Sequence, residues 1–135
     1  MNALVSARMA PDDRRALGLA AFIGTAGVMH FVRPEFFDAL VPTWMPGSAR
    51  TTTSVSGGFE LAGALLVACK RTRKLGALVC LLTFLGVYPA NIQSALDGGI
   101  ADAPEPFNTA AAAWLRLPLQ VPMLLWARRV YRDQR

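Results

Sequence analysis

Five polar side chains stand inside otherwise apolar stretches of this 135-residue chain, and their chemistry suits a buried binding site. They are His30, Glu60, Asn91, Arg116 and Gln120. A carboxylate or a guanidinium can hold a ligand oxygen and its proton, and amide or imidazole groups can orient that ligand through hydrogen bonds. An unpaired Arg116 side chain in lipid would raise the free energy of membrane insertion by about 3 kcal/mol. Because Glu60 is the only acid inside these stretches, we expect it to pair with Arg116.

The rest of the sequence does not point to a familiar catalytic centre. It has one histidine with no acidic cluster around it, so we expect no metal site. It contains no Ser-His-Asp set, phosphate-binding loop or haem-ligand pair. Cys69 and Cys80 lack the CxxC spacing of redox or metal motifs, and we expect both to be small buried apolar side chains. Glu60 is then the one candidate proton carrier, and we do not expect this chain to be a catalyst on its own.

Four apolar stretches must position these side chains. Hydrophobic residues make up 53% of the chain and charged residues 17%, against about 25% charged in an average soluble domain. The stretches are residues 15–32, 53–69, 75–96 and 109–127. Each has about the 17–25 residues that cross a bilayer as a helix. We predict an all-α, four-helix transmembrane bundle with up-down-up-down topology over residues 15–127. The flanking segments are a tail of residues 1–14 and a basic tail of residues 128–135.

The net charge of +5 is concentrated at one end of such a bundle. Most of the 14 Lys and Arg residues lie in the two tails or in the 70–74 turn, whereas Arg33 and Arg50 lie in the opposite loops. This is the positive-inside pattern, so we predict that both termini are cytoplasmic. A nucleic-acid surface would need a folded basic face outside the membrane, and no nucleic-acid partner is expected.

The first apolar stretch has a competing interpretation. Arg14 and Arg15 followed by an apolar run are also typical of a secretory signal, including the twin-arginine type. The run from Ala16 to Val32 is longer than the roughly 7–15 apolar residues of such a signal, and no clear cleavage site closes it. We therefore expect a retained helix.

The loops and small residues give further expectations. Residues 33–52 are too short and too rich in proline to cross a bilayer, so we expect them to lie on the outer membrane face with their aromatic side chains at headgroup level. Ser54, Gly58 and Ala62 recur every four positions, which predicts a close-packing helix face. Gly24 and Gly27 are expected to let another helix pack closely against the first helix in the same way.

Counted from the predicted helix ends, the five polar residues all fall in the outer half of the bundle. Pro89, Pro118 and Pro122 lie in the same region, and each removes one hydrogen bond to a helix carbonyl. Freed carbonyls inside a bundle offer acceptors to polar side chains and water. The pattern predicts a polar pocket that opens outward, and it leaves open a Glu60–Arg116 pair that only fixes the helix register.

Four motifs taken together resemble the DoxX-like family of small bacterial four-helix membrane proteins. They are His-Phe-x-x-Pro from His30, Ser-Gly-x-x-Glu ending at Glu60, Pro-Ala-Asn ending at Asn91, and Arg-Leu-Pro-x-Gln from Arg116. The resemblance extends from about Gly27 to Trp126. It implies that the family's motif positions are His30, Pro34, Glu60, Asn91, Arg116 and Gln120. It also implies a multi-pass protein of the bacterial inner (plasma) membrane.

The resemblance implies an auxiliary subunit of a membrane redox system, because relatives are linked to a thiosulfate:quinone oxidoreductase and to a complex that handles thiol stress. Quinone is the one cofactor that it suggests. The alternative is a non-catalytic assembly or scaffold factor for a membrane or exported partner, which would dock on residues 33–52. A small transporter is a third and less favoured hypothesis, because a chain of this length would have to form a homo-oligomer to build the two gates that a transporter needs. The expected partners are the lipid bilayer and a redox or exported protein, with a homo-oligomer left open.

Overall fold

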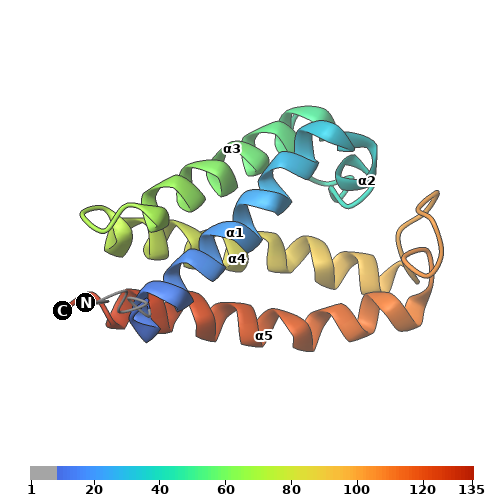
Figure 1. Cartoon of the computed structure of the whole chain (residues 1–135). Helices are drawn as coiled ribbons and strands as arrows, with labels where there is room; N and C mark the ends of the chain where they lie inside the picture. The colour runs from blue at the N-terminus through green and yellow to red at the C-terminus, as the bar shows by residue number, and fades with distance from the viewer. Residues whose placement is uncertain (1–8) are drawn as a thin grey trace, which may run out of the picture.

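The computed structural model describes residues 9–135, and this part of the chain folds into five α-helices without a β-strand. The helices are α1 (Pro11–Val32), α2 (Pro34–Asp38), α3 (Ala49–Ala68), α4 (Arg73–Leu96) and α5 (Ala110–Arg132). The four long helices run alternately in opposite directions, so the start of α1 and the end of α5 lie at the same end of the molecule as the α3–α4 turn (Figure 1). We call this end of the molecule the terminal end, and the opposite end, with α2 and residues 97–109, the loop end. The all-helical class is confirmed.

The helix boundaries follow from local capping. Pro11 opens α1 at a position where its missing N–H costs nothing. The side chains of Ser48 and Thr109 cap α3 and α5 by accepting hydrogen bonds from the backbone N–H groups of Thr51 and Ala112. As a result, α3 begins before the predicted residue 53.

The predicted tails are partly helical. The first helix begins at Pro11 and the last ends at Arg132, so part of each tail predicted at residues 1–14 and 128–135 continues a long helix. Residues 1–8 of the predicted N-terminal tail lie outside the described residues.

The loop end is closed by aromatic side chains. Phe36 and Phe37 of α2 contact each other edge to face, with ring centroids 5.2 Å apart, and Phe36 meets Phe107 in the same way at 5.4 Å. These contacts join α2 to the segment between α4 and α5. Ile100 of that segment is 1% exposed and anchors it. Residues 33–52, which were expected to be too short and too rich in proline to cross a bilayer, contain the short helix α2 and the first turn of α3.

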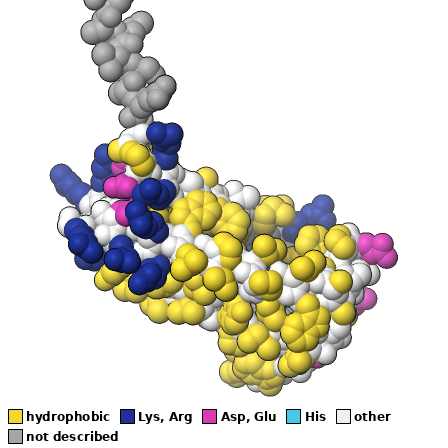
Figure 2. Space-filling model, turned by 90° about the horizontal axis from the view of Figure 1, so that it is seen from below, with side chains coloured by type: hydrophobic (Ala, Val, Ile, Leu, Met, Phe, Trp, Pro, Cys, Tyr) yellow, Lys and Arg dark blue, Asp and Glu magenta, His cyan; other side chains and the backbone are white. Residues whose placement is uncertain are grey.

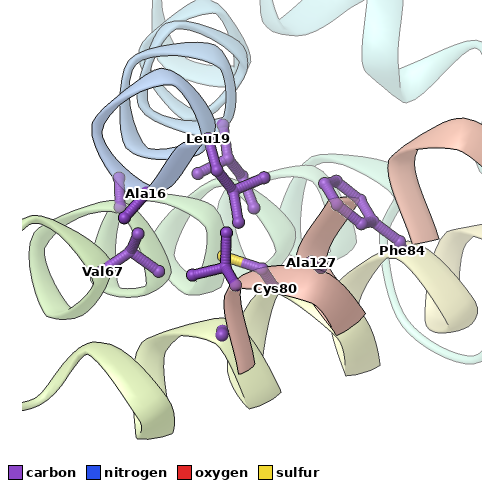
Figure 3. Close-up of a cluster of buried hydrophobic side chains, with 10 residues drawn as sticks. Ala16, Leu19, Val67, Cys80, Phe84 and Ala127 are labelled. Carbon is purple, nitrogen blue, oxygen red and sulfur yellow. The ribbon is translucent and has the colours of Figure 1, made fainter. Parts of the chain in front are cut away.

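The helices pack in the order α1, α3, α4, α5, and the apolar core lies between them (Figure 3). Its members are mostly small: Ala16, Leu19, Ile23, Ala64, Val67, Ala77, Cys80, Phe84, Ala127 and Val130. α1 and α5 meet around Trp126, whose indole N–H donates to the backbone oxygen of Arg15 over 2.9 Å. Figure 1 shows α1 crossing away from α5 toward the loop end.

Glycines let neighbouring helices approach each other closely, but Gly58, the glycine of α3 that was predicted to do so, is not one of them. A Cβ on Gly57 would overlap the side chains of His30 and Phe31, and a Cβ on Gly63 would press on Cys80. Gly58, part of the predicted packing face, has nothing within 4 Å and is exposed. The prediction was wrong because Gly57 and Gly63 point inward, while the face through Gly58 and Ala62 points outward. On α1, Gly24 and Gly27 do contact α3, as expected.

The terminal end carries a dense set of charges, seen as dark blue and magenta side chains at one end of the apolar surface in Figure 2. Asp13 of α1 takes ion pairs from Arg73 at 2.8 Å and Lys70 at 3.1 Å. These hydrogen bonds, with Arg73 the stronger, hold the pKa of Asp13 below its usual range. Arg15 bridges to Asp133 at 3.2 Å. The ion pairs therefore tie the start of α1 to the α3–α4 turn and to the end of α5.

Two of the helices, α1 and α4, are long and apolar enough to cross a membrane. Only 28% of the most apolar 18 residues of each helix is buried inside the molecule. Leu82 and Leu85 of α4, for example, are 58% and 50% exposed. The apolar faces of these helices therefore point mainly outward, unlike those of the core helix of a soluble protein.

The close approach of α4 to α3 at Gly76 generates a stability prediction. A Cβ at Gly76 would overlap the backbone of Leu66 and Val67, which cannot turn aside as a side chain can. We expect Gly76→Ala to lower the free energy of unfolding by about 1–3 kcal/mol. The control is Gly86→Ala in the same helix, where nothing lies within 4 Å. It should be neutral or stabilising by up to about 1 kcal/mol. Thermal unfolding of the purified proteins measures both, and equal effects would contradict the packing.

Candidate functional site

The structure brings together two of the five predicted polar residues across α1 and α3. His30 Nδ1 lies 3.0 Å from Glu60 Oε2, and both side chains are about nine-tenths buried. The approach depends on small residues on both helices. Gly57 lies against the His30 side chain, and Gly27 lies against the backbone and Cβ atoms around Glu60. A larger residue at either position would push the two helices, and with them this pair, apart.

The imidazole is fixed by more than the carboxylate. His30 Nδ1 is also 2.8 Å from the backbone oxygen of Ala26, one turn earlier in α1. The ring stacks on Phe37 of α2 with centroids 3.7 Å apart. Because a single nitrogen faces both oxygens, its one proton cannot be aligned with both at once. Glu60 Oε2 is buried and has no aligned hydrogen bond within residues 9–135.

Two further predicted residues meet across α4 and α5. Arg116 Nη1 donates to Asn91 Oδ1 at 3.5 Å. Three residues before Asn91, the Tyr88 hydroxyl donates to the backbone oxygen of Leu117 at 3.4 Å. Pro89, Pro118 and Pro122 all lie within helices, as the sequence indicated. This part of the helix pair therefore combines polar side chains with weakened helix hydrogen bonding.

The predicted pairing of Glu60 with Arg116 is wrong. Within residues 9–135, no carboxylate lies within ion-pair distance of the Arg116 guanidinium, and Glu60 faces His30 instead. The contacts of Gly63 with Cys80 and of Gly76 with Val67 fix the register of α3 against α4. Continued along the pair, this register puts Asn91 level with the first turn of α3, roughly 12 Å from Glu60 along the helix axis. The cap at Ser48 starts α3 early, so Glu60 lies deeper than predicted.

Several buried polar atoms in this half of the molecule lack a hydrogen-bond partner among the described residues. Gln120, one turn after Arg116, is 4% exposed, and its Oε1 has none. Arg116 Nη2 also has none.

The sequence did not single out three other members of the group, Asp38 Oδ1, Thr53 Oγ1 and Ser94 Oγ. Two of them, Asp38 and Thr53, lie close together, and the Thr53 hydroxyl is the main cause that holds the pKa of Asp38 below its usual range. Thr53 and Ser94 lie within long helices. Helical spacing could have found them, because Ser94 follows Asn91 by three residues and Thr53 precedes Gly57 by four. Native structures leave few such atoms, so each needs an explanation.

These polar residues are packed between helices rather than lining an open depression. One depression, of about 520 Å³, is an apolar groove between α1 and α3 around Gly24 and Leu61. Another, of about 350 Å³, lies at the loop end between residues 39–44 and the end of α4. None of the five predicted residues lines either of them, although Ser94 lines the second.

The cysteines do not form a redox pair. Both are free thiols, with Cys80 buried in the core and Cys69 exposed at the end of α3. The expectation that both would be buried is therefore wrong for Cys69, which caps the last turn of α3 at the terminal end. Within residues 9–135 there is no group of three or more His, Cys, Asp or Glu side chains that could hold a metal ion.

Comparison with known proteins gives one match. Residues 19–131 match the family model described as a domain of unknown function, DUF8561. The match covers most of the chain and contains all five predicted polar residues. No match was found among curated proteins or among solved structures.

The contact between His30 and Glu60 generates a test of their coupling. Removing one partner of a buried pair leaves the other without compensation, so His30→Phe and Glu60→Met should each destabilise by about 3 kcal/mol. The double variant should be more stable than the sum of the two effects predicts, with a coupling of about 1–3 kcal/mol. Unfolding in mild detergent, followed by circular dichroism, measures the cycle. Val28→Ala and Leu82→Ala, on exposed positions of α1 and α4, form the additive control pair. Additivity at His30 and Glu60 would contradict the coupling.

Proposed function

We propose a function from the site itself, because the chain belongs to the DUF8561 family, whose description assigns no activity. The first part of the proposal is that α1, α3, α4 and α5 all cross a membrane as an up-down-up-down bundle. Large apolar side chains exposed on α3 and α5 support it, among them Phe59 and Leu65 on α3 and Leu119 on α5. Such a surface is favourable in contact with lipid, whereas in water it would promote aggregation.

The second part concerns orientation. The terminal end holds most of the basic side chains, while the loop end holds Arg33 and Arg50 together with several acids. The positive-inside rule then puts the terminal end, with both termini, in the cytoplasm. The DoxX-like resemblance supports a bacterial inner membrane as the location. In this orientation the Asn91–Arg116 contact lies in the outer half of the membrane.

The third part is that these buried polar groups bind a small lipophilic ligand that carries oxygen atoms, such as a quinone. Glu60 and Arg116 lie in two separate groups, so each would hold a different oxygen of the ligand, or its proton. Asn91, His30 and Gln120 would orient it. α1 and α5 meet around Trp126 near the terminal end, so a ligand would reach the groups from the lipid side near the loop end. The DoxX-like resemblance supports an auxiliary role in a membrane redox system, with catalysis carried out by another subunit.

One observation carries this proposal. Gln120 Oε1 is buried between helices and has no hydrogen-bond partner within the described residues, and Glu60 Oε2 must share the one His30 nitrogen with the Ala26 carbonyl. A polar network whose only role is to fix the helix register gains nothing from unsatisfied members, because each costs about 1–3 kcal/mol. Groups that must exchange partners with a ligand have to keep such atoms available.

The alternative function, an assembly or scaffold factor, is favoured by the aromatic surface of the loop end. Trp44 is 60% exposed and Phe107 is 43% exposed. Both belong to the segments that close this end of the bundle. A partner docked there would be sensitive to Trp44→Ala, and insensitive to Glu60→Gln in a folded protein.

Organic extraction of the purified protein, followed by mass spectrometry, tests ligand binding. The protein, Glu60→Gln and Gln120→Met are prepared alike in mild detergent. Thr25→Val is the matched control, because its hydroxyl is also on a helix but bonds its own backbone at Ala21 on an exposed face. We expect the parent and Thr25→Val to retain a quinone or another isoprenoid. The two site variants should lose most of it. Equal retention by all four proteins, or no specific lipid in any of them while all are folded, would contradict the proposal.

A further inference from the structure

Among residues 9–135, Arg116 is a cation at the contact between two helices that has no carboxylate partner. At the terminal end, by contrast, Arg15, Lys70, Arg73 and Arg129 all have carboxylate partners in Asp12, Asp13 and Asp133. At the loop end, Arg50 pairs with Asp38 at 2.8 Å. Arg116 has a neutral partner only, the Asn91 amide, and its Nη2 is buried with no hydrogen-bond partner in residues 9–135.

This arrangement is expensive for the fold taken alone. A guanidinium stays protonated in proteins, so it cannot reduce the cost of burial by losing its charge. Glu60 does not compensate it, because Glu60 faces His30 and is not within ion-pair distance of Arg116. The nearest acid along α4 toward the loop end, Asp97, accepts a hydrogen bond from Gln93 instead. No carboxylate of residues 9–135 therefore compensates the charge of this half-buried side chain, and an anion from outside the described residues would do so.

We propose that Arg116, with Asn91, forms a binding site for an oxyanion carried by a lipid, namely the phosphate of an anionic phospholipid headgroup in the outer leaflet. The guanidinium fork offers N–H donors that match phosphate oxygens, and Nη2 is available. Asn91 is the positioning residue, because its carbonyl oxygen receives Nη1 and thereby orients the fork.

The depth of the site fits a headgroup. Arg116 is the seventh residue of α5, which puts its Cα roughly 9 Å from the start of the helix. The long side chain can extend toward the interface from there. Trp114 and Leu115 on the same part of α5 are 53% and 65% exposed, and they present an apolar surface for an acyl chain. A free phosphate ion would gain the charge contact without this apolar surface, so the lipid-borne source is favoured.

This inference rests on the membrane crossing in the proposed function, but it does not require quinone binding. Quinone retention is tested at Glu60 and Gln120, whereas headgroup binding is tested at Arg116. Either proposal can therefore fail its test while the other is supported.

Native mass spectrometry of the full chain in mild detergent tests the site. The probes are dioleoyl phosphatidylglycerol, which is anionic, and dioleoyl phosphatidylethanolamine, which has the same acyl chains and no net charge. We expect the protein to retain phosphatidylglycerol preferentially. Arg116→Gln, which keeps a hydrogen-bond donor for Asn91, should lower that preference about five-fold. Arg50→Gln, which removes an exposed cation already paired with Asp38, should leave it unchanged.

Stability separates headgroup binding from a merely structural role. In phosphatidylethanolamine, Arg116→Gln should unfold at the same temperature as the parent or higher, because it removes an uncompensated charge. In phosphatidylglycerol the parent should be the more stable protein. If Arg116→Gln folds poorly, Arg116→Lys keeps the charge without the fork, and it should retain only part of the lipid preference.

Three results would overturn the proposal. One is an equal lipid preference in the parent and Arg116→Gln. Another is a destabilised Arg116→Gln in both lipids, which would make Arg116 a structural residue. The third is a rise in melting temperature with inorganic phosphate that needs Arg116 but is accompanied by no lipid preference. That result would assign the site to a soluble anion.

Discussion

The close approach of α3 to its neighbours is the constraint on which the rest of the structure depends. Gly57 lets α1 come near enough for His30 to reach Glu60, and Gly63 and Gly76 let α4 pack against the other side. These contacts fix the relative height of every side chain on three helices. They also explain why small residues such as Ala16 can form the core. Because the helix backbones lie close together, little space between them is left for side chains to fill.

One consequence is that the polar side chains are divided between two helix pairs. His30 and Glu60 belong to α1 and α3, while Asn91 and Arg116 belong to α4 and α5. A single network joining opposite charges would have been a satisfied structural element. Two separate groups instead leave a carboxylate beside a shared histidine proton and a guanidinium beside a neutral amide. Both arrangements keep polar atoms available, and that is the physical basis of the ligand and headgroup proposals.

The sequence predicted the helical class and the four long helices, because long apolar stretches bounded by charges and capping residues leave few alternatives. It also predicted four of the buried polar residues, His30, Glu60, Asn91 and Gln120, but did not single out Thr53, Arg73 or Ser94. It could not predict their partners. Pairing depends on register, and the register is decided by which glycine faces inward, Gly57 or Gly58. The resemblance to DoxX-like proteins picked the same residues but carried no information on contacts. Ser94 was missed because a serine in a helix is common and carries no signal alone.

The central claim is that the loop end faces outward across a membrane from the terminal end, and cysteine labelling in intact cells tests it most directly. Cys69 is a natural reporter, since it is exposed at the terminal end. Ala101→Cys in a Cys69→Ser background reports the loop end, where Ala101 is exposed. The account predicts that a membrane-impermeant maleimide labels the cysteine at position 101 in intact cells, and labels Cys69 only after permeabilisation. Labelling of Cys69 in intact cells, or equal access to both positions, would contradict it.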